Sequence, residues 1–366
     1  MRQARLDQVR ARLESLEVDA LLVTNPSNRR WVSGFTGSAG VILISRDNAR
    51  FATDSRYWEQ VGLQSPQFEL VPVAGATTGV APELLEDTAG MTIGYEPSHL
   101  TMAAYGQWTT AVSALPEAAR PNLVPAANAI EALRLIKDAD ELDALTRAVK
   151  LGDEGMIHAI SVVEPGMTER QLAWEIQRYV MEHGADDLSF NTIVAGGDWG
   201  SAPHAYPRNV AIQADTGVVI DMGVIVDGYC SDLTRTLFLG EPDDHFKRVY
   251  DIVLTAQTMA EERIESGMTG AQAHAIAATV IAEAGFGEYF GHGLGHGVGL
   301  DVHEAPRLAP ASESIMEDGQ IFTVEPGIYI PGWGGVRIED QCVMQSGRAR
   351  SLSAAPKLDL EIGVTA

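Results

Sequence analysis

The sequence predicts two domains: an α/β domain over residues 1–127 and an α+β domain over residues 128–366 that is built from two similar halves. Three observations support this fold class. The chain of 366 residues is long enough for two hydrophobic cores. A segment with three prolines, Leu115–Pro125, interrupts the pattern of helices and strands. The pattern Glu-x-Gly-Met-Thr-x-x-Gln occurs twice, at 164–171 and at 265–272, which favours a duplicated half-domain.

In the first domain, short apolar runs alternate with segments of helical periodicity, a pattern typical of an α/β fold. We expect an amphipathic helix over residues 6–16 and a hairpin centred on residues 46–48. The small and aromatic residues of segment 28–38 suggest either a contact surface or a surface loop with a buried aromatic. Arg46 at the hairpin tip could reach a neighbouring subunit's site. The expected strands are 20–24, 41–45, 49–53, 68–73 and 92–95. The further expected helices are 57–63 and 101–115.

The second domain is rich in helix-start signals. Asp138 with Glu141 forms a plausible capping box that opens a long helix through about Val162. Each copy of the repeated pattern also places Thr and Gln in capping-box positions at the start of a further helix.

Composition excludes several classes of partner. A formal net charge of −24 disfavours nucleic acid and anionic membranes, because both require a basic surface. No apolar run approaches the ~20 residues of a membrane span, and no apolar signal core is present at the N-terminus, so we expect a cytoplasmic protein. Cys230 and Cys342 fit reduced thiols. The expected class of protein is therefore an enzyme or a small-molecule-binding protein.

Residues 291–304 are the most unusual stretch. Glycine alternates with other residues from 291 to 299, so an extended strand would direct His292 and His296 to one face. Interior glycines weaken a strand, and a sequence tolerates them mainly where something approaches the backbone closely. The alternative is a glycine-rich loop with solvated histidines.

Two aspartates lie on one predicted hairpin. Apolar strands flank Asp227-Gly228, a strong signal for a two-residue turn. That turn places Asp221 opposite Thr234 and diagonal to Asp232, so the two carboxylates share a face at ~7–8 Å. Such a pair repels unless a cation or a proton lies between its members, and a metal is favoured over two solvent-facing charges.

Two glutamates join this pair from later strands. Glu325 ends the strand predicted at 320–325, and Glu339 shares a face with Arg337 in the strand predicted at 336–343. Four carboxylates with one imidazole suit hard or borderline divalent ions, with Mn²⁺ ahead of Zn²⁺. Five ligands are too many for one ion with an open position but fit two bridged ions. Arg337 is the expected supporting partner of Glu339.

In their order along the chain, these motifs resemble those of the pita-bread metallopeptidases, the family of methionine aminopeptidase, aminopeptidase P and prolidase. The motifs are Val219-Ile-Asp-Met-Gly, Ser231-Asp-Leu-Thr-Arg-Thr, His292-Gly-Leu-Gly-His-Gly, Val302-His-Glu, Thr323-Val-Glu-Pro-Gly and Val336-Arg-Ile-Glu-Asp. Trp31-Val-Ser-Gly-Phe-Thr-Gly-Ser38 resembles a marker of the creatinase-like N-terminal domain. The resemblance spans essentially the whole chain. It implies an α+β pita-bread (creatinase/aminopeptidase) domain with pseudo-twofold duplication and a peptidase acting on peptides with proline in second position.

The resemblance also implies roles for individual residues. Glu325 would act as general base on a bridging water, and His303 and His204 would be catalytic, substrate-binding histidines that donate to the developing oxyanion. His292 resembles the family's other pocket histidine. Tyr206 and Arg208 replace the small residues and the Ser-Asp or Ser-Asn expected after His204, so the pocket wall differs there. Two divalent ions, most often manganese with cobalt or zinc as alternatives, would be bound by Asp221, Asp232, His296, Glu325 and Glu339.

The resemblance leaves the type of proline peptidase open. A dipeptidase has to bind the carboxylate of a C-terminal proline, for which arginine is the natural donor. Arg307 resembles an arginine with that role in some microbial prolidases, and Arg337 is an alternative, so prolidase is favoured over aminopeptidase P. A creatine-hydrolysing enzyme is disfavoured because all five ligands are retained, and a non-catalytic binding protein because its ligands would be eroded. Proteins of this architecture are usually homodimers, and Phe35–Ser38 is the candidate segment for closing the partner's site.

Overall fold

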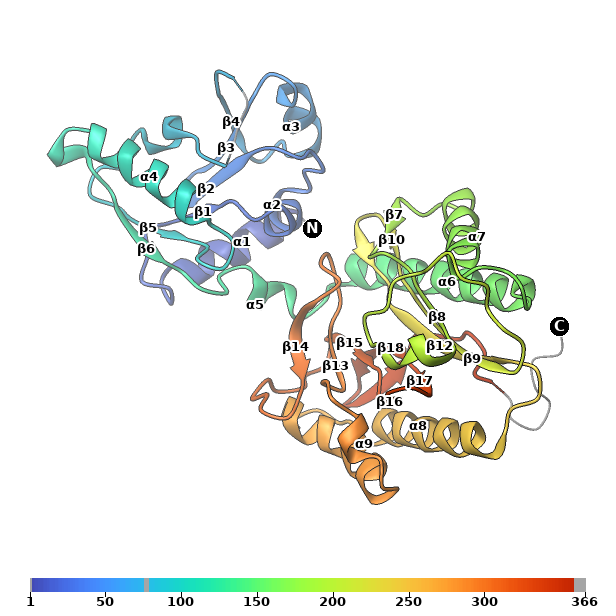
Figure 1. The fold of residues 1–366 in the computed structure, drawn as a ribbon. Helices are drawn as coiled ribbons and strands as arrows, with labels where there is room; N and C mark the ends of the chain where they lie inside the picture. Colours follow the sequence, from blue (N-terminus) through green and yellow to red (C-terminus); the bar gives the residue numbers. More distant parts are fainter. Residues whose placement is uncertain (1, 76–78, 359–366) are drawn as a thin grey trace. The chain divides into compact units, whose positions relative to one another are not determined.

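The computed structural model describes residues 2–75 and 79–358, and the chain divides into two compact units (Figure 1). The units comprise Met1–Arg134 and Leu135–Ala366. The division suggested by the sequence, after residue 127, lies before helix α5 (Glu131–Arg134). This helix belongs to the first unit because Asn28 hydrogen-bonds both Glu131 and Arg134, each at 2.7 Å.

The first unit is built on a six-stranded mixed sheet, which confirms the predicted α/β domain. Its strands run in the order β4-β3-β2-β1-β5-β6, with antiparallel β1–β2 and β2–β3 pairs and parallel pairs elsewhere. The strands are β1 (Ala20–Val23), β2 (Val41–Ser45), β3 (Ala49–Thr53), β4 (Glu69–Pro72), β5 (Thr92–Tyr95) and β6 (Asn122–Pro125). The helices are α1 (Arg2–Leu13), α2 (Pro26–Ser33), α3 (Trp58–Gln64), α4 (Met102–Ala114) and α5, with short 3-10 helices at Pro82–Leu85 and Glu117–Ala119.

Two expectations for this unit were wrong. The proline-containing segment 115–125, expected to mark the domain boundary, contains β6, and the two units divide after Arg134. Prolines are compatible with an edge strand that lacks a partner on one side. The expected contact surface at 28–38 is mostly buried: α2 places Trp31 in the core, and the Phe35 ring packs against Phe51 at 4.8 Å. Within Phe35–Ser38, Phe35 is buried, and only Thr36 and Ser38 are exposed.

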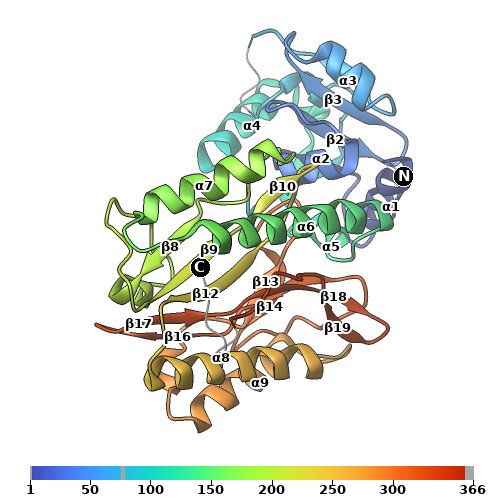
Figure 2. The same ribbon diagram turned by 90° about the vertical axis from the view of Figure 1, so that its right-hand side faces the viewer.

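The second unit consists of two helix pairs with strands between them, as Figure 2 shows for α6 and α7 on one side and α8 and α9 on the other. The helices are α6 (Ala139–Val162), α7 (Glu169–Glu182), α8 (Asp244–Arg263) and α9 (Gly270–Glu283). Capping boxes open α6 at Asp138, α7 at Thr168 and α9 at Thr269, as predicted. Separate hydrophobic clusters lie beneath the two pairs, which confirms the duplicated arrangement.

The strands between the helix pairs form four small sheets. Their orders are β11-β10-β7, β12-β9-β8, β14-β13-β15-β18-β19 and β16-β17. The strands are β7 (Asp187–Leu188), β8 (Ile193–Gly196), β9 (Thr216–Met222), β10 (Val224–Val226), β11 (Tyr229–Cys230), β12 (Leu233–Leu239), β13 (Gly295–Gly297), β14 (Glu304–Leu308), β15 (Ile321–Val324), β16 (Gly327–Ile330), β17 (Gly334–Arg337), β18 (Asp340–Gln345) and β19 (Arg348–Ser351). Short 3-10 helices occur at Gly197–Ser201 and Gly287–Tyr289.

The glycine-rich stretch forms a much shorter strand than expected. Only Gly295–Gly297 is extended, as β13, and its register against β14 shifts after His296. The reason for the glycines is nevertheless the predicted one, close approach of another backbone. A Cβ on Gly295 would lie 2.0 Å from the carbonyl oxygen of Thr323, and one on Gly297 would lie 2.0 Å from that of Ala305. Side chains are therefore sterically excluded at both positions.

The strand predicted at 336–343 is split into β17 and β18, which pair with different strands. Glu339 lies at the break, where its backbone N–H donates to the carbonyl of Thr234. In the parts of the chain that the structure describes, no helix combines the length and apolarity needed to cross a membrane.

Candidate active site

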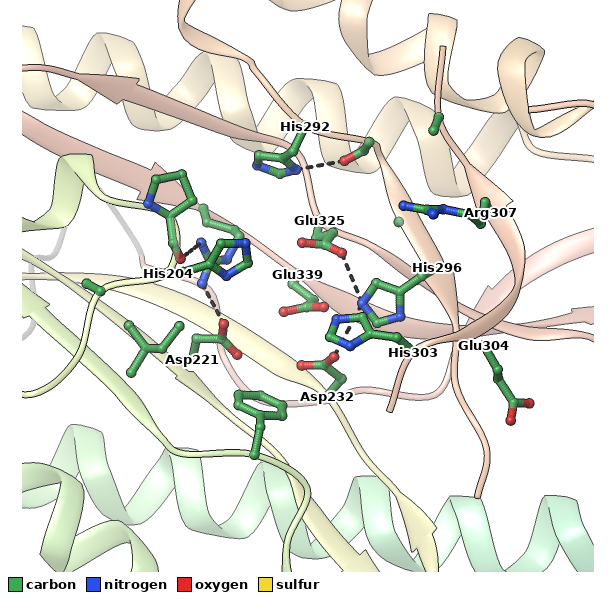
Figure 3. A pocket seen from close by; sticks show the side chains of 18 of the residues that line it. His204, Asp221, Asp232, His292, His296, His303, Glu304, Arg307, Glu325 and Glu339 are labelled. Carbon is green, nitrogen blue, oxygen red and sulfur yellow. Dashed lines mark hydrogen bonds and ion pairs between the residues drawn. The ribbon is translucent and has the colours of Figure 1, made fainter. Parts of the chain in front are cut away.

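A cavity of about 780 Å³ lies in the second unit (Figure 3). Strands of both halves contribute to its wall, so residues far apart in the sequence meet there. The cavity is lined by all the predicted site residues: His204, Tyr206, Asp221, Asp232, His292, His296, His303, Arg307, Glu325, Arg337 and Glu339.

The hairpin that carries the two aspartates has the predicted geometry. Asp227 and Gly228 have φ values of 49° and 78°, as a two-residue turn with two left-handed residues requires. Asp221 on β9 pairs with Thr234 on β12, and Asp232 immediately precedes β12. Both residues line the cavity, Asp221 from β9 and Asp232 from the short segment that leads into β12.

The predicted metal ligands form a tight group. Donor atoms of Asp232, His296 and Glu339 all lie within 4.8 Å of one another. His296 Nε2 lies 3.6 Å from Asp232 Oδ2 and 3.3 Å from Glu325 Oε1. Asp221 is not part of this three-residue group, although it lines the same cavity.

The clustered carboxylates around His296 repel one another, which favours a bound cation. Burial, followed by repulsion from the other carboxylates, raises the pKa values of Asp232 and Glu339 well above the usual range. Burial likewise raises the pKa of Glu325 to about 7. Burial lowers the pKa of His296 to about 4, which keeps its imidazole neutral and able to ligate a metal. A divalent cation would relieve the repulsion among the carboxylates.

A buried orphan oxygen gives independent evidence that the residues fit a metal. Oδ1 of Asp221 is buried and has no hydrogen-bond partner among the described residues. Such an atom costs free energy unless a ligand satisfies it. Carboxylate oxygens with one imidazole nitrogen are donors suited to hard or borderline divalent ions.

Arg337 has a different partner from the one predicted. Its Nη2 donates to Asp221 Oδ2 at 2.5 Å, and its other nitrogens donate to Thr234 Oγ1, the Tyr329 hydroxyl and the Pro203 carbonyl. Glu339 instead accepts from Thr234 Oγ1 at 2.6 Å. Because the strand breaks after β17, the guanidinium reaches across to β9. It is 4% exposed and is fully engaged, so it is a poor donor for a substrate carboxylate.

The three additional histidines occupy distinct environments. His292 Nε2 lies 3.0 Å from the Tyr329 hydroxyl, and burial lowers its pKa to about 4. His303 and His204 are exposed to the cavity, and the His303 ring centroid lies 4.3 Å from that of His296. In Figure 3, His204 and Arg307 lie to either side of the carboxylate group.

The wall around Tyr206 is held by a clamp that was not predicted. The Tyr206 ring packs edge-on against Trp199 at 5.3 Å, and its carbonyl accepts from Trp199 Nε1. Arg208 lies over the Trp199 ring and pairs with the buried Glu169 at 2.7 Å. The unusual residues after His204 therefore form an ordered surface rather than a loose loop.

Sequence reasoning missed several residues of the site. Tyr329 could have been found, because it follows Glu325 by only four residues and lies on the strand β16 that begins at Gly327. Glu304 belongs to the Val302-His-Glu motif, but its pairing with Lys137 gave no signal, since 167 residues separate the two. The apolar wall formed by Phe190 and Ile193 was also missed, because neither residue stands out in a short apolar segment.

The two-unit fold and the cavity of clustered carboxylates and histidines define a metal-dependent hydrolase. The chain belongs to metallopeptidase family M24, because residues 143–346 match the sequence model of that family. Residues 5–136 match the model of the creatinase/prolidase N-terminal domain. It is therefore a peptidase, and peptidases of this family use divalent metals.

The similarity to known proteins covers nearly the whole chain. The uncharacterized peptidase YqhT of Bacillus subtilis is 39% identical over 96% of this chain and 98% of its own. An Xaa-Pro dipeptidase from Bacillus anthracis is 38% identical, covers 98% and 99% of the two chains, and superposes with a TM-score of 0.91. An X-Pro aminopeptidase from Thermotoga maritima MSB8 is 31% identical, covers 94% and 98%, and has a TM-score of 0.84.

Proposed function

We propose that this chain is an Xaa-Pro dipeptidase, a prolidase, that works with two divalent ions, most often manganese. The observation that carries the proposal is the meeting of four carboxylates and His296 in one cavity that also contains Arg307. The similar Xaa-Pro dipeptidase from Bacillus anthracis supports the same substrate class. The ions would be held by Asp221, Asp232, His296, Glu325 and Glu339.

When bound, the ions would polarise the scissile carbonyl and make a water molecule more acidic. Glu325 is the proposed general base, because its side chain is the most accessible of the three carboxylates that pair with a cationic or histidine group, at 18% against 12% for Asp221 and 7% for Asp232. It can therefore accept a proton from the cavity while its neighbours stay enclosed. His292 contributes by lining the pocket beside Tyr329.

The exposed histidines and the aromatic wall are assigned to the substrate. His303 and His204 lie at the cavity surface, where an imidazole N–H can donate to the oxyanion that develops on the carbonyl oxygen. Tyr206 supplies an ordered apolar surface beside His204. Arg307 is the proposed partner of the proline carboxylate, since a guanidinium can bind a carboxylate through two parallel hydrogen bonds. We assign this role to Arg307 rather than to Arg337, because Arg337 already donates to Asp221.

Removal of the N-terminal residue from longer Xaa-Pro peptides, the activity of aminopeptidase P, is the alternative. The similar X-Pro aminopeptidase from Thermotoga maritima supports it, at lower identity. We also propose a cytoplasmic homodimer, because proteins of this architecture are usually homodimers and because two cysteines are too few for the disulfide framework of a secreted protein.

The two candidate functions are separated by substrate length. Leu-Pro and Leu-Pro-Gly are compared as substrates after chelation and addition of Mn²⁺. The dipeptidase proposal predicts efficient, metal-dependent cleavage of Leu-Pro alone, and loss of that activity in Arg307→Ala. Efficient cleavage of Leu-Pro-Gly that persists in Arg307→Ala would favour the aminopeptidase.

A further inference from the structure

A buried ion pair lies beside the proposed substrate-binding residues. Lys137, in the segment between α5 and α6, places its Nζ 2.6 Å from Glu304 Oε1. The side chains are 2% and 12% exposed, so water screens the pair only weakly. The backbone N–H of Lys137 donates to the Gly319 carbonyl at 2.9 Å, which fixes the position of the Lys137 backbone.

Glu304 occupies a sensitive position in the cavity wall. It is the first residue of β14, directly after His303 and three residues before Arg307, and all three line the cavity. In Figure 3, Glu304 lies on the same side of the carboxylate group as Arg307. A Cβ on Gly299 would lie 2.5 Å from Glu304 Oε1, so the glutamate carboxylate packs directly against this glycine.

The negative charge of the Glu304 carboxylate would repel the C-terminal carboxylate of a dipeptide substrate. Like charges repel strongly where burial limits screening. The substrate carboxylate must nevertheless approach Arg307, on the strand that Glu304 begins. The ammonium group of Lys137 is placed to cancel the charge of Glu304 without entering the cavity, since Lys137 is not among the lining residues.

We propose that Lys137 is a positioning residue for substrates that carry a free C-terminal carboxylate. Its ammonium group neutralises the carboxylate of Glu304, so that the positive charge of Arg307 faces the substrate undiminished. This inference rests on the dipeptidase function proposed above and extends it, because it assigns selection for the anionic end of the dipeptide to a residue outside the cavity.

The test combines four variants with two ligands, one with a charged and one with a neutral C-terminal group. KM and kcat for Leu-Pro are measured at pH 8 in the Mn²⁺-loaded parent, Lys137→Met, Glu304→Gln and the double variant. Leu-Pro amide, which lacks the carboxylate, is measured as a competitive inhibitor of Leu-Pro hydrolysis, so its own turnover is not needed. Lys137→Arg, which keeps the positive charge, is the conservative control.

The proposal predicts a selective pattern. Lys137→Met raises KM for Leu-Pro roughly tenfold, the effect of a repulsion of about 1.4 kcal/mol, and changes the inhibition constant of the amide less than about twofold. The double variant, whose pair is neutral, returns KM close to the parent value, and Lys137→Arg stays close to it throughout. Glu304→Gln alone does not raise KM.

Two results would overturn the inference while leaving the dipeptidase function intact. One is equal weakening of Leu-Pro and its amide in Lys137→Met, which would indicate a merely structural role. The other is a double variant as impaired as Lys137→Met. If Lys137→Met does not fold, the double variant and Glu304→Gln decide, and a raised KM for Leu-Pro in both contradicts the proposal. A parent enzyme that does not hydrolyse Leu-Pro would refute the proposed function, and this inference with it.

Discussion

Arg337 Nη2 donates to Oδ2 of Asp221 at 2.5 Å and leaves Oδ1, the other oxygen of that carboxylate, buried without a partner among the described residues. One oxygen of the aspartate is therefore held by the protein and the other is left for a cation. The two residues come from β17 and β9, so the contact also connects the halves of the second unit.

The first prediction follows from this contact. Arg337→Lys should weaken metal binding, because one ammonium group cannot reach Asp221, Thr234 and the Tyr329 hydroxyl at once. We expect a loss of roughly 10–100-fold in Mn²⁺ affinity, as is usual when a partner of a metal ligand is removed. Calorimetric titration measures it, with the exposed Arg350→Lys as control. Equal affinities in the two variants would contradict the proposed support of Asp221.

The second prediction concerns the proposed general base. Glu325→Gln keeps the shape of the side chain but removes its ability to accept a proton. We expect kcat for Leu-Pro to fall by roughly 10²–10⁴-fold, with an unchanged unfolding midpoint. Glu317→Gln, on the exposed surface, is the matched control. Activity within a few-fold of the parent would remove Glu325 from the mechanism.

The third prediction concerns the wall that carries His204 and Tyr206. Arg208→Leu leaves the Glu169 carboxylate, 2% exposed, with only backbone N–H donors such as that of Gly196. We expect a loss of about 2 kcal/mol in the free energy of unfolding, the usual range for a hydrogen bond to a charged group, and a raised KM. Urea denaturation measures the first effect, with the exposed Arg170→Leu as control. Identical midpoints would show that the clamp adds no stability.

The fourth prediction is a dependence of stability on pH. Burial, followed by the nearby Asp340, raises the pKa of Glu261 from 4.5 to about 7 in the folded state. The folded protein therefore holds a proton that the unfolded chain releases, and the resulting stabilisation is complete below pH 4.5 and lost as the pH rises through 7. Glu261→Gln should flatten this component of the urea midpoint between pH 4.5 and 7. A pH profile parallel to that of the parent would exclude Glu261 as the group responsible.

Local patterns predicted most of the fold and much of the site. The two-residue turn at Asp227-Gly228 fixes the register of its hairpin, so the pairing of Asp221 with Thr234 could be worked out from the sequence. The capping boxes at Thr168 and Thr269 likewise depend only on residues three positions apart.

The features that sequence reasoning missed depend on partners distant in the chain. The extent of β13 is set by backbones approaching Gly295 and Gly297, and the partner of Arg337 by the strand break before Glu339. The Lys137–Glu304 pair joins two segments that carry no mutual signal. The partners of long side chains depend on how the strands are arranged in space, so local sequence patterns do not predict them.

The most direct test of the account is a Mn²⁺ titration of the chelator-treated protein, with bound metal and Leu-Pro hydrolysis measured on the same samples. We predict two ions per chain, no hydrolysis before metal is added, and activity that rises with occupancy. Full hydrolysis in the metal-free protein, or the absence of stoichiometric binding, would contradict it.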